Sequence, residues 1–201
     1  WGPDPKNPLR SSSSPTPQPT TQPGTQPSDL DGTVTIYIER TGDENSDPTK
    51  DPGHVTIAVD DGTDDNQEGQ DDNVVGHWPE DPSNKKNPTV RGCVRPDHDR
   101  VQDGEYDATI RIRVPRDVAR RLLELIREWV RAYPKWDPQW QNCVWFVLTL
   151  LREAGVLVDD TAWQRVTDYY WTHGYYSPSL LEQYLREEAK KRGWEVSDKC
   201  K

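Results

Sequence analysis

Several short stretches in the first half of the chain alternate between apolar and polar residues. In the stretch TVTIYIER, for example, Val34, Ile36 and Ile38 fall at every second position. Because the side chains of a β-strand point alternately to the two faces of a sheet, this period predicts strands with one buried face. The strands predicted in this way cover residues 33–40, 54–59, 74–78, 89–94 and 108–114.

The period of the apolar residues changes after Pro115, a residue that suits the first turn of a helix. From here the apolar residues recur at every third or fourth position, which is the stripe of an amphipathic helix. They are Val118, Leu122, Ile126 and Trp129. The sequence therefore predicts a long helix directly after the last of these strands.

Two further helices are predicted in the last third of the chain. One covers residues 142–154 and ends at Gly155, and the other begins near Ser179 and ends before Gly193. Ser179 and Glu182 have the spacing of a capping box, in which each side chain binds a backbone N–H of the first turn. Strands first and helices later predict an α+β fold with an antiparallel sheet.

Residues 1–32 differ in composition from the rest of the chain, because Pro, Ser, Thr and Gln dominate there. Such a segment buries too little apolar surface to offset the entropy lost on ordering, so we expect a disordered linker. Residues 33–201 are expected to form one domain. The chain starts with Trp and contains no Met, which indicates a fragment or processed product with a module upstream of the linker. A disordered terminus without a purpose is the alternative.

The net charge of the chain is −10 and its pI is about 4.9. Because phosphate backbones bind to basic faces, this charge argues against a nucleic-acid partner. It is compatible with a basic protein partner. No apolar run reaches the roughly 18 residues of a membrane-spanning helix, so no transmembrane segment is expected.

One of the 3 cysteines, Cys143, lies where the predicted helix 142–154 begins. The unpaired N–H groups and the positive dipole end of a helix N-terminus stabilise an anion such as a thiolate. This position therefore suits a nucleophile. A small thiol also fills a core well, and the residues alone leave both interpretations open. Cys93 and Cys200 could form a disulfide, but the sequence does not decide whether they do.

A thiolate nucleophile needs a proton carrier, and the chain has 4 histidines. His54 is the best placed, because it begins a predicted strand and points away from the apolar face of that strand. His77 stands in GHWPED at the end of the next strand, His98 in a charged loop and His173 in an aromatic segment. A single histidine is more often structural than catalytic. A cysteine at a helix start combined with a histidine on an earlier strand is more informative.

The acidic stretch of residues 60–73 is a poor match to a calcium-binding loop. When Asp64 is taken as the first position of such a loop, Val75 stands where the last ligand should be Glu. We therefore expect a solvated loop there, and no metal or other cofactor.

Three segments together resemble the motifs of circularly permuted papain-like cysteine hydrolases. This NlpC-type group includes lecithin:retinol acyltransferase-like proteins and bacterial amidase toxins. In that family the histidine strand precedes the cysteine helix, and the nucleophile sits in an Asn-Cys-x-x-Phe context, which residues 142–146 match. The three segments, which lie within residues 33–158, are GHVTIAV (53–59), GHWPED (76–81) and QNCVWFVLTLLREAGV (141–156).

The resemblance implies that an antiparallel sheet packs against a helix that carries the nucleophile, Cys143, with His54 as the base. For the third catalytic group, some relatives use a second histidine on the next strand, which would be His77. Others have an aromatic residue before the Trp-Pro pair, which would make His77 structural. The oxyanion donors would include the backbone N–H of the nucleophile, assisted by the side chain of Gln141 or Asn142.

The resemblance also implies a function, that of a cysteine amidase or peptidase that cleaves peptide bonds of peptidoglycan through an acyl-enzyme. Such a domain would be the toxin of a larger secreted bacterial protein, with an upstream delivery module, and would act in the periplasm of a target bacterium. An immunity protein would then be its partner.

Two alternative functions stay open at the level of the sequence. Acyltransferase or phospholipase relatives use the same Cys-His pair on lipid acyl groups. An enzyme that acts on lipids should expose an apolar face, and this polar chain, with a mean hydropathy of −1.03, does not suggest one. A non-enzymatic binding module on the same scaffold would keep Cys143 as a core thiol.

Overall fold

The computed structural model describes residues 30–40, 53–63, 73–80, 90–132, 135–137, 142–157, 164–165 and 177–199. Most of the acidic stretch 60–73, residues 1–29 of the linker expected over 1–32, Gln141, His173 and Cys200 lie outside the described residues. The strands are β1 (Gly32–Glu39), β2 (His54–Asp60), β3 (Val74–Pro79), β4 (Val90–Pro96), β5 (Ala108–Val114), β6 (Lys135–Trp136) and β7 (Glu195–Asp198). The helices are α1 (His98–Gln102), α2 (Arg116–Ala132), α3 (Cys143–Glu153) and α5 (Pro178–Arg192).

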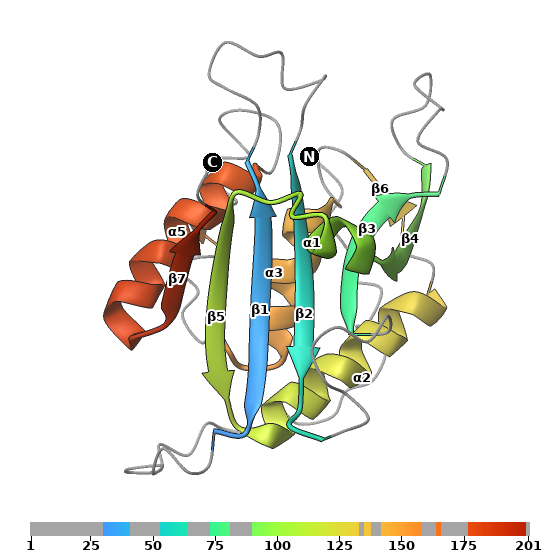
Figure 1. Ribbon diagram of the computed structural model, residues 1–201. Helices are drawn as coiled ribbons and strands as arrows, with labels where there is room; N and C mark the ends of the chain where they lie inside the picture. The colour runs from blue at the N-terminus through green and yellow to red at the C-terminus, as the bar shows by residue number, and fades with distance from the viewer. Residues whose placement is uncertain are drawn as a thin grey trace.

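The strands form an antiparallel sheet in the order β6-β4-β3-β2-β1-β5-β7. Helices α2, α3 and α5 lie behind the sheet, and the short α1 lies in front of it near β2 and β3 (Figure 1). The α+β class and the antiparallel sheet expected from the sequence are therefore confirmed. β1 is paired along its length with β2 on one side and β5 on the other, so it is an inner strand of the sheet.

The alternating residues of the central strands form the core face of the sheet, as their period predicts. Ile36 of β1 pairs with Ile57 of β2 and with Ile110 of β5, so three isoleucines lie side by side in one row. All three side chains are fully buried, together with residues of α2, α3 and α5. Burial of each such side chain contributes about 1.5–3 kcal/mol, so this row anchors the three helices to the sheet.

Helix α3 is buried from Cys143 to Leu151, on every side. A helix that is apolar all round belongs in an interior, and here it packs on β2 and β3 and against α2. Helix α2 shows the predicted stripe instead, with Leu122, Ile126 and Trp129 buried and its charged residues outside. The position of α3 is therefore fixed by packing along its whole length.

The start of α5 differs from the sequence prediction. Its N-cap is Ser177 and its first residue is Pro178, so the proposed capping box of Ser179 and Glu182 is wrong. The Glu182 carboxylate accepts hydrogen bonds from Arg40 at 2.7 Å on each oxygen and from Arg186 at 2.7 Å. The two-pronged guanidinium of Arg40 matches the Glu182 carboxylate better than a single backbone N–H does. This ion pair connects α5 to the end of β1.

Three elements were not expected from the sequence, namely α1, β6 and β7. Each has five residues or fewer, and β7 is a polar edge strand that depends on pairing with β5. The predicted end of the last helix is confirmed, since Gly193 caps α5 with a positive φ of 72°.

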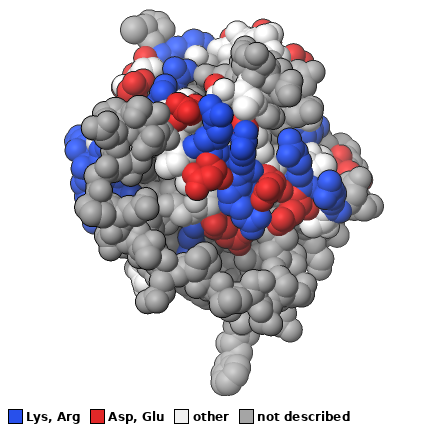
Figure 2. Space-filling model, turned by 90° about the horizontal axis from the view of Figure 1, so that it is seen from below, with Lys and Arg blue, Asp and Glu red and all other residues white. Residues whose placement is uncertain are grey.

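The surface of the described residues is charged and mixed in sign. Seen from below, basic and acidic side chains are interspersed (Figure 2). Arginines of α2 form ion pairs, such as Arg116 with Asp31, Arg120 with Asp61 and Arg121 with Glu124. Within the described ranges, no helix combines the length and the apolar character needed to cross a bilayer.

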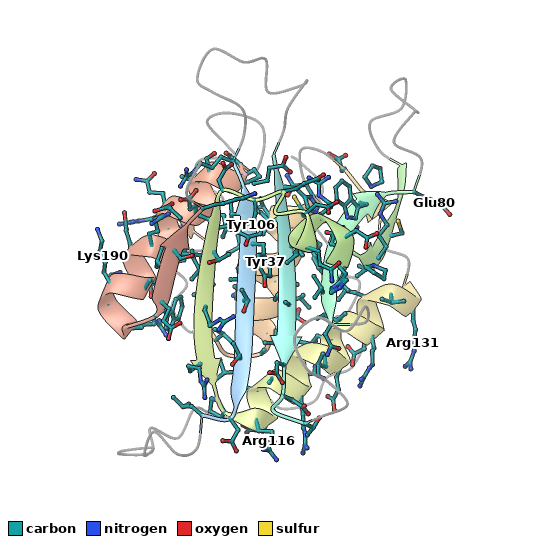
Figure 3. The ribbon with its side chains drawn as sticks, in the orientation of Figure 1. Tyr37, Glu80, Tyr106, Arg116, Arg131 and Lys190 are labelled. Atoms are coloured by element: carbon teal, nitrogen blue, oxygen red, sulfur yellow. The ribbon has the colours of Figure 1, made fainter. Side chains whose placement is uncertain are left out.

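The sheet face opposite the three large helices carries polar and aromatic side chains. Tyr37 of β1 and Tyr106, which precedes β5, lie there edge to face with ring centroids 5.1 Å apart (Figure 3). Thr56 of β2 and Trp78 of β3 belong to the same face by strand alternation. The sheet residues of the candidate site, His54 among them, lie on this face, whereas its cysteine is supplied by α3.

Candidate functional site

Cys143 is the first residue of α3, as expected from the sequence. The preceding residue, Asn142, has an extended backbone and is the N-cap, with its side-chain Oδ1 accepting from the N–H of Val144 at 3.0 Å and of Trp145 at 3.2 Å. An Asn cap satisfies two of the N–H groups that a helix start leaves unpaired, and it fixes where the helix begins. The thiol is therefore held at the positive end of a buried helix.

His54 is the first residue of β2, and it lies beyond the last pair between β2 and β3, which joins Thr56 to Gly76. Its imidazole is buried, and the Cys143 side chain lies close enough to it to affect its pKa. Burial alone would lower the pKa of His54, but the charge of Cys143, together with hydrogen bonds to Asp97 and Cys143, raises that pKa to about 9. The two residues singled out in the sequence are therefore brought together.

The other side of the imidazole faces Asp97, which lies between β4 and α1. His54 Nε2 is 2.9 Å from Asp97 Oδ2, so Nδ1 is the ring nitrogen left to face the sulfur. Thr56 Oγ1 donates to the same oxygen at 2.8 Å, and Trp78 Nε1 donates to Oδ1 at 2.8 Å. Burial would raise the pKa of Asp97, but these hydrogen bonds and the charge of His54 lower it, so the carboxyl is ionised.

Gly76 makes room for this arrangement. A Cβ at this position would lie 2.0 Å from Asp97 Oδ2, 2.6 Å from His54 Nε2 and 2.8 Å from Trp78 Nε1. Real Cβ atoms do not approach other atoms so closely, and the atoms that would be hit belong to side chains held in place by hydrogen bonds. The absence of a side chain at Gly76 is therefore a condition for the His54–Asp97 contact.

Trp78 covers one face of His54. The two rings are stacked, with centroids 3.8 Å apart and an angle of 27° between their planes. The guanidinium carbons of Arg95 and Arg100 lie 4.8 Å and 5.2 Å from the centre of the indole. One aromatic side chain thus contacts the imidazole, the carboxylate and two cations.

His77 does not lie in the third position that the sequence suggested for it. Strand alternation turns it to the core face, where its ring packs on Trp129 and Phe146 with centroids 5.8 Å and 5.7 Å away. Burial lowers the pKa of His77 to about 4, so the ring is neutral. Among the described residues no group meets the geometry of a hydrogen bond with either ring nitrogen, although the nearby backbone of Asn142 acts to raise the pKa of His77 against the effect of burial. The group that binds His54 is Asp97.

The remaining candidates have other positions. Asn142 uses its side-chain oxygen as the helix cap, and Gln141 lies outside the described residues. His98 is in α1 and binds Gln102 with 2.5 Å between the side-chain nitrogens. Cys93 is a half-buried free thiol on β4.

Sequence reasoning missed Asp97, Thr56, Trp78 and Gly76 as parts of the site. Trp78 and Gly76 stand in the GHWPED segment that carries the resemblance, and Asp97 is the neighbour of His98 in the charged loop. Asp97 directly follows β4, and its approach to His54 depends on the pairing of β4 with β3, which no local sequence pattern reveals.

We expect Gly76→Ala to break the His54–Asp97 contact and to slow alkylation of Cys143 by iodoacetamide at pH 6.5 by roughly tenfold or more, since the thiolate loses its oriented partner. Gly155→Ala is the matched control, because it places a methyl at a positive φ of 76° in open space, far from the site in the chain. Its backbone strain lowers stability without touching the imidazole. Equal alkylation rates in folded Gly76→Ala and in the parent chain would contradict the steric role.

Scans of family models, of curated proteins and of solved structures found no match to this chain.

Proposed function

We propose that the chain is a cysteine hydrolase that cleaves amide bonds with Cys143 as nucleophile and His54 as general acid and base. The observation that carries the proposal is a thiol at a helix N-terminus beside an imidazole whose other nitrogen is held by the buried carboxylate of Asp97. A nucleophile, a base and a group that orients the base are the parts of a nucleophilic catalyst. The circularly permuted papain-like architecture is part of this proposal, supported by the order of strand histidine and helix cysteine along the chain.

The first half of the reaction forms an acyl-enzyme. The Cys143 thiolate attacks the carbonyl carbon of the amide, and the negative charge moves to the carbonyl oxygen. The backbone N–H of Cys143 is the donor we propose for that oxygen, since the Asn142 cap engages the N–H groups of Val144 and Trp145. When the tetrahedral intermediate collapses, the C–N bond breaks and His54 Nδ1 gives its proton to the leaving amine. The products of this half are the free amine and a thioester on Cys143.

The second half releases the acid. Neutral His54 takes a proton from a water molecule, and the hydroxide attacks the thioester carbonyl. The C–S bond breaks, the carboxylic acid leaves and the thiolate with its imidazolium is restored. Throughout, Asp97 keeps Nε2 protonated and the ring in one orientation, so it acts through His54 as a positioning residue.

The substrate class we propose is the peptide part of peptidoglycan, cleaved by a secreted antibacterial toxin in the periplasm of its target. The basis is the resemblance of GHVTIAV, GHWPED and QNCVWF to NlpC-type amidases. The net charge of −10 fits a basic immunity protein as partner.

Lipid acyl transfer by the same residues is less well supported. A catalyst that docks on a lipid surface should expose large apolar side chains. Among the described residues the exposed large hydrophobic side chain is Val130, at 44 %. A pure binding module is also disfavoured, because binding alone does not require a buried imidazole placed between a thiol and a carboxylate.

We expect Cys143→Ala to lose hydrolysis of purified peptidoglycan by roughly a thousandfold or more, since the acyl-enzyme cannot form. Released fragments are measured by mass spectrometry, and lysis is compared after periplasmic and cytoplasmic expression. Cys93→Ala is the matched control, because it removes the half-buried thiol of β4 and should keep activity. Cleavage by Cys143→Ala would contradict the mechanism, and turnover of phospholipids in place of peptidoglycan would contradict the substrate.

The pH dependence follows from His54. Hydrolysis needs its imidazolium as acid, so kcat/KM should fall as the pH rises through about 9. The negative charge of Asp97 helps to raise the pKa of His54, so Asp97→Asn should move this alkaline limb to lower pH and reduce kcat/KM by roughly tenfold or more.

The matched control for Asp97→Asn is Asp99→Asn, which changes an exposed carboxylate two residues away. It should leave the pH profile of kcat/KM unaltered, since Asp99 makes no contact with His54 among those described. An alkaline limb that is the same in Asp97→Asn and in the parent chain would show that Asp97 does not act on the imidazole.

A further inference from the structure

Trp78 is the side chain around which the candidate site is assembled. It contributes its indole N–H to Asp97 Oδ1 and one ring face to His54. Its own position is set by β3, the strand next to β2. In β3, Trp78 pairs with Cys93 of β4. Two different contacts of one rigid side chain therefore converge on the two groups that must be aligned.

The hydrogen bond from Trp78 locks the Asp97 carboxylate. Oδ2 is engaged by His54 and Thr56, and Oδ1 is engaged by the indole. With donors on both oxygens, rotation of the carboxylate would break at least one hydrogen bond, and a buried charged oxygen without a partner is strongly disfavoured. Without the indole N–H, Oδ1 loses this partner and the carboxylate is held through Oδ2 alone, so its orientation toward Nε2 is less restricted.

The stacked face of Trp78 acts on His54 itself. At 3.8 Å between centroids, the rings are in van der Waals contact, so water is excluded from that face of the imidazole. The negative face of an indole attracts a cation, so the stack favours the imidazolium over the neutral ring. This attraction works in the same direction as the charges of Cys143 and Asp97.

Other charged groups face this pair of rings. On β1, Glu39 is the cross-strand partner of His54, and its carboxylate is bound by Arg100 at 2.6 Å. On β4, Arg95 lies over the indole, and on β3 the neutral His77 faces the core. The arginines disfavour a further positive charge nearby, and Glu39 offsets Arg100, so the stack, Asp97 and Cys143 remain the groups that favour the imidazolium.

We infer that Trp78 is a positioning residue of this site, which orients Asp97 through its N–H and keeps the His54 imidazolium facing Cys143 through its ring. The inference rests on the proposed function, in which Cys143 and His54 are the reacting pair. It separates two contributions of one side chain, since Trp78→Phe keeps an aromatic face and removes the N–H, whereas Trp78→Leu removes both.

The experiment measures the rate of Cys143 alkylation by iodoacetamide between pH 5 and pH 10 in the full chain, without any substrate. In the parent chain the rate should change a second time near pH 9, as His54 loses its proton. Trp78→Leu should move this alkaline inflection down by about half a unit or more, because the cation loses its aromatic face. Trp78→Phe should shift this inflection less than Trp78→Leu does, because it keeps an aromatic ring. In a separate hydrolysis assay on purified peptidoglycan, Trp78→Phe should still lose roughly tenfold in kcat/KM, because the indole N–H no longer holds Asp97.

Trp194→Phe is the matched control, since that indole also lies under a guanidinium, with Arg192 at 5.5 Å, but at the far end of α5. It should leave both the inflection and kcat/KM unchanged. Circular dichroism and thermal melting of each variant separate a loss of folding from a change at the site, and Trp78→Phe is the variant to use if Trp78→Leu does not fold.

An inflection that stays at the parent pH in folded Trp78→Leu, or in Trp78→Phe together with unchanged kcat/KM, would overturn the inference. The proposed function fails in a different way, by an absence of peptidoglycan hydrolysis in the parent chain. The alkylation readout does not depend on that result, so a shifted inflection in a chain without hydrolase activity would keep the role of Trp78 and reject the substrate.

Discussion

A buried carboxylate needs partners, and the way in which Asp97 obtains them organises the site. An ionised carboxyl in a protein interior is tolerated only when its oxygens are hydrogen-bonded and its charge is matched. Asp97 receives Thr56 and His54 from β2 and Trp78 from β3, while its own N–H donates to the carbonyl of Val74 at 2.9 Å. The requirement of one charge thus ties three neighbouring segments together, and the imidazole that satisfies it faces the thiol at the start of α3.

The fold supplies the positions that this interaction uses. Alternation along β2 places His54 and Thr56 on one face, with Val55 and Ile57 in the core. The core residues hold the sheet against α3, whose start is set by the Asn142 cap. The polar site and the apolar core are therefore built from the same strands, and a shift of register by one residue would remove both at once.

Much of this arrangement could be predicted from the sequence, because it depends on local patterns. The strands with period two, the amphipathic α2 and the start of the cysteine helix are all properties of neighbouring residues, and His54 and Cys143 are marked by the elements that they begin. The capping box at Ser179 was a wrong prediction, because Arg40, more than 140 positions earlier, offers Glu182 a better partner than the local backbone.

The site residues that the sequence analysis missed depend on contacts between distant parts of the chain, not on local patterns. Asp97 has no local pattern that marks it, and it meets His54 only because β4 pairs with β3 across a stretch of chain that spacing does not fix. Gly76 matters because of the atoms that crowd it, and these come from Asp97, His54 and Trp78. His77 was expected beside His54, but alternation along β3 turns it to the core, which is a consequence of register that a histidine motif does not reveal.

The measurement that tests the central claim most directly is an NMR titration of the His54 imidazole in the parent chain and in Cys143→Ala, with His77 as the internal reference. The side chain of Cys143 is one of the groups that raise the pKa of His54 to about 9, so the resonance should titrate near that pH in the parent chain and at a clearly lower pH in the variant. A His54 resonance that titrates at the same pH in both proteins would contradict an ion pair between the two side chains, and with it the assignment of this site as a cysteine catalyst.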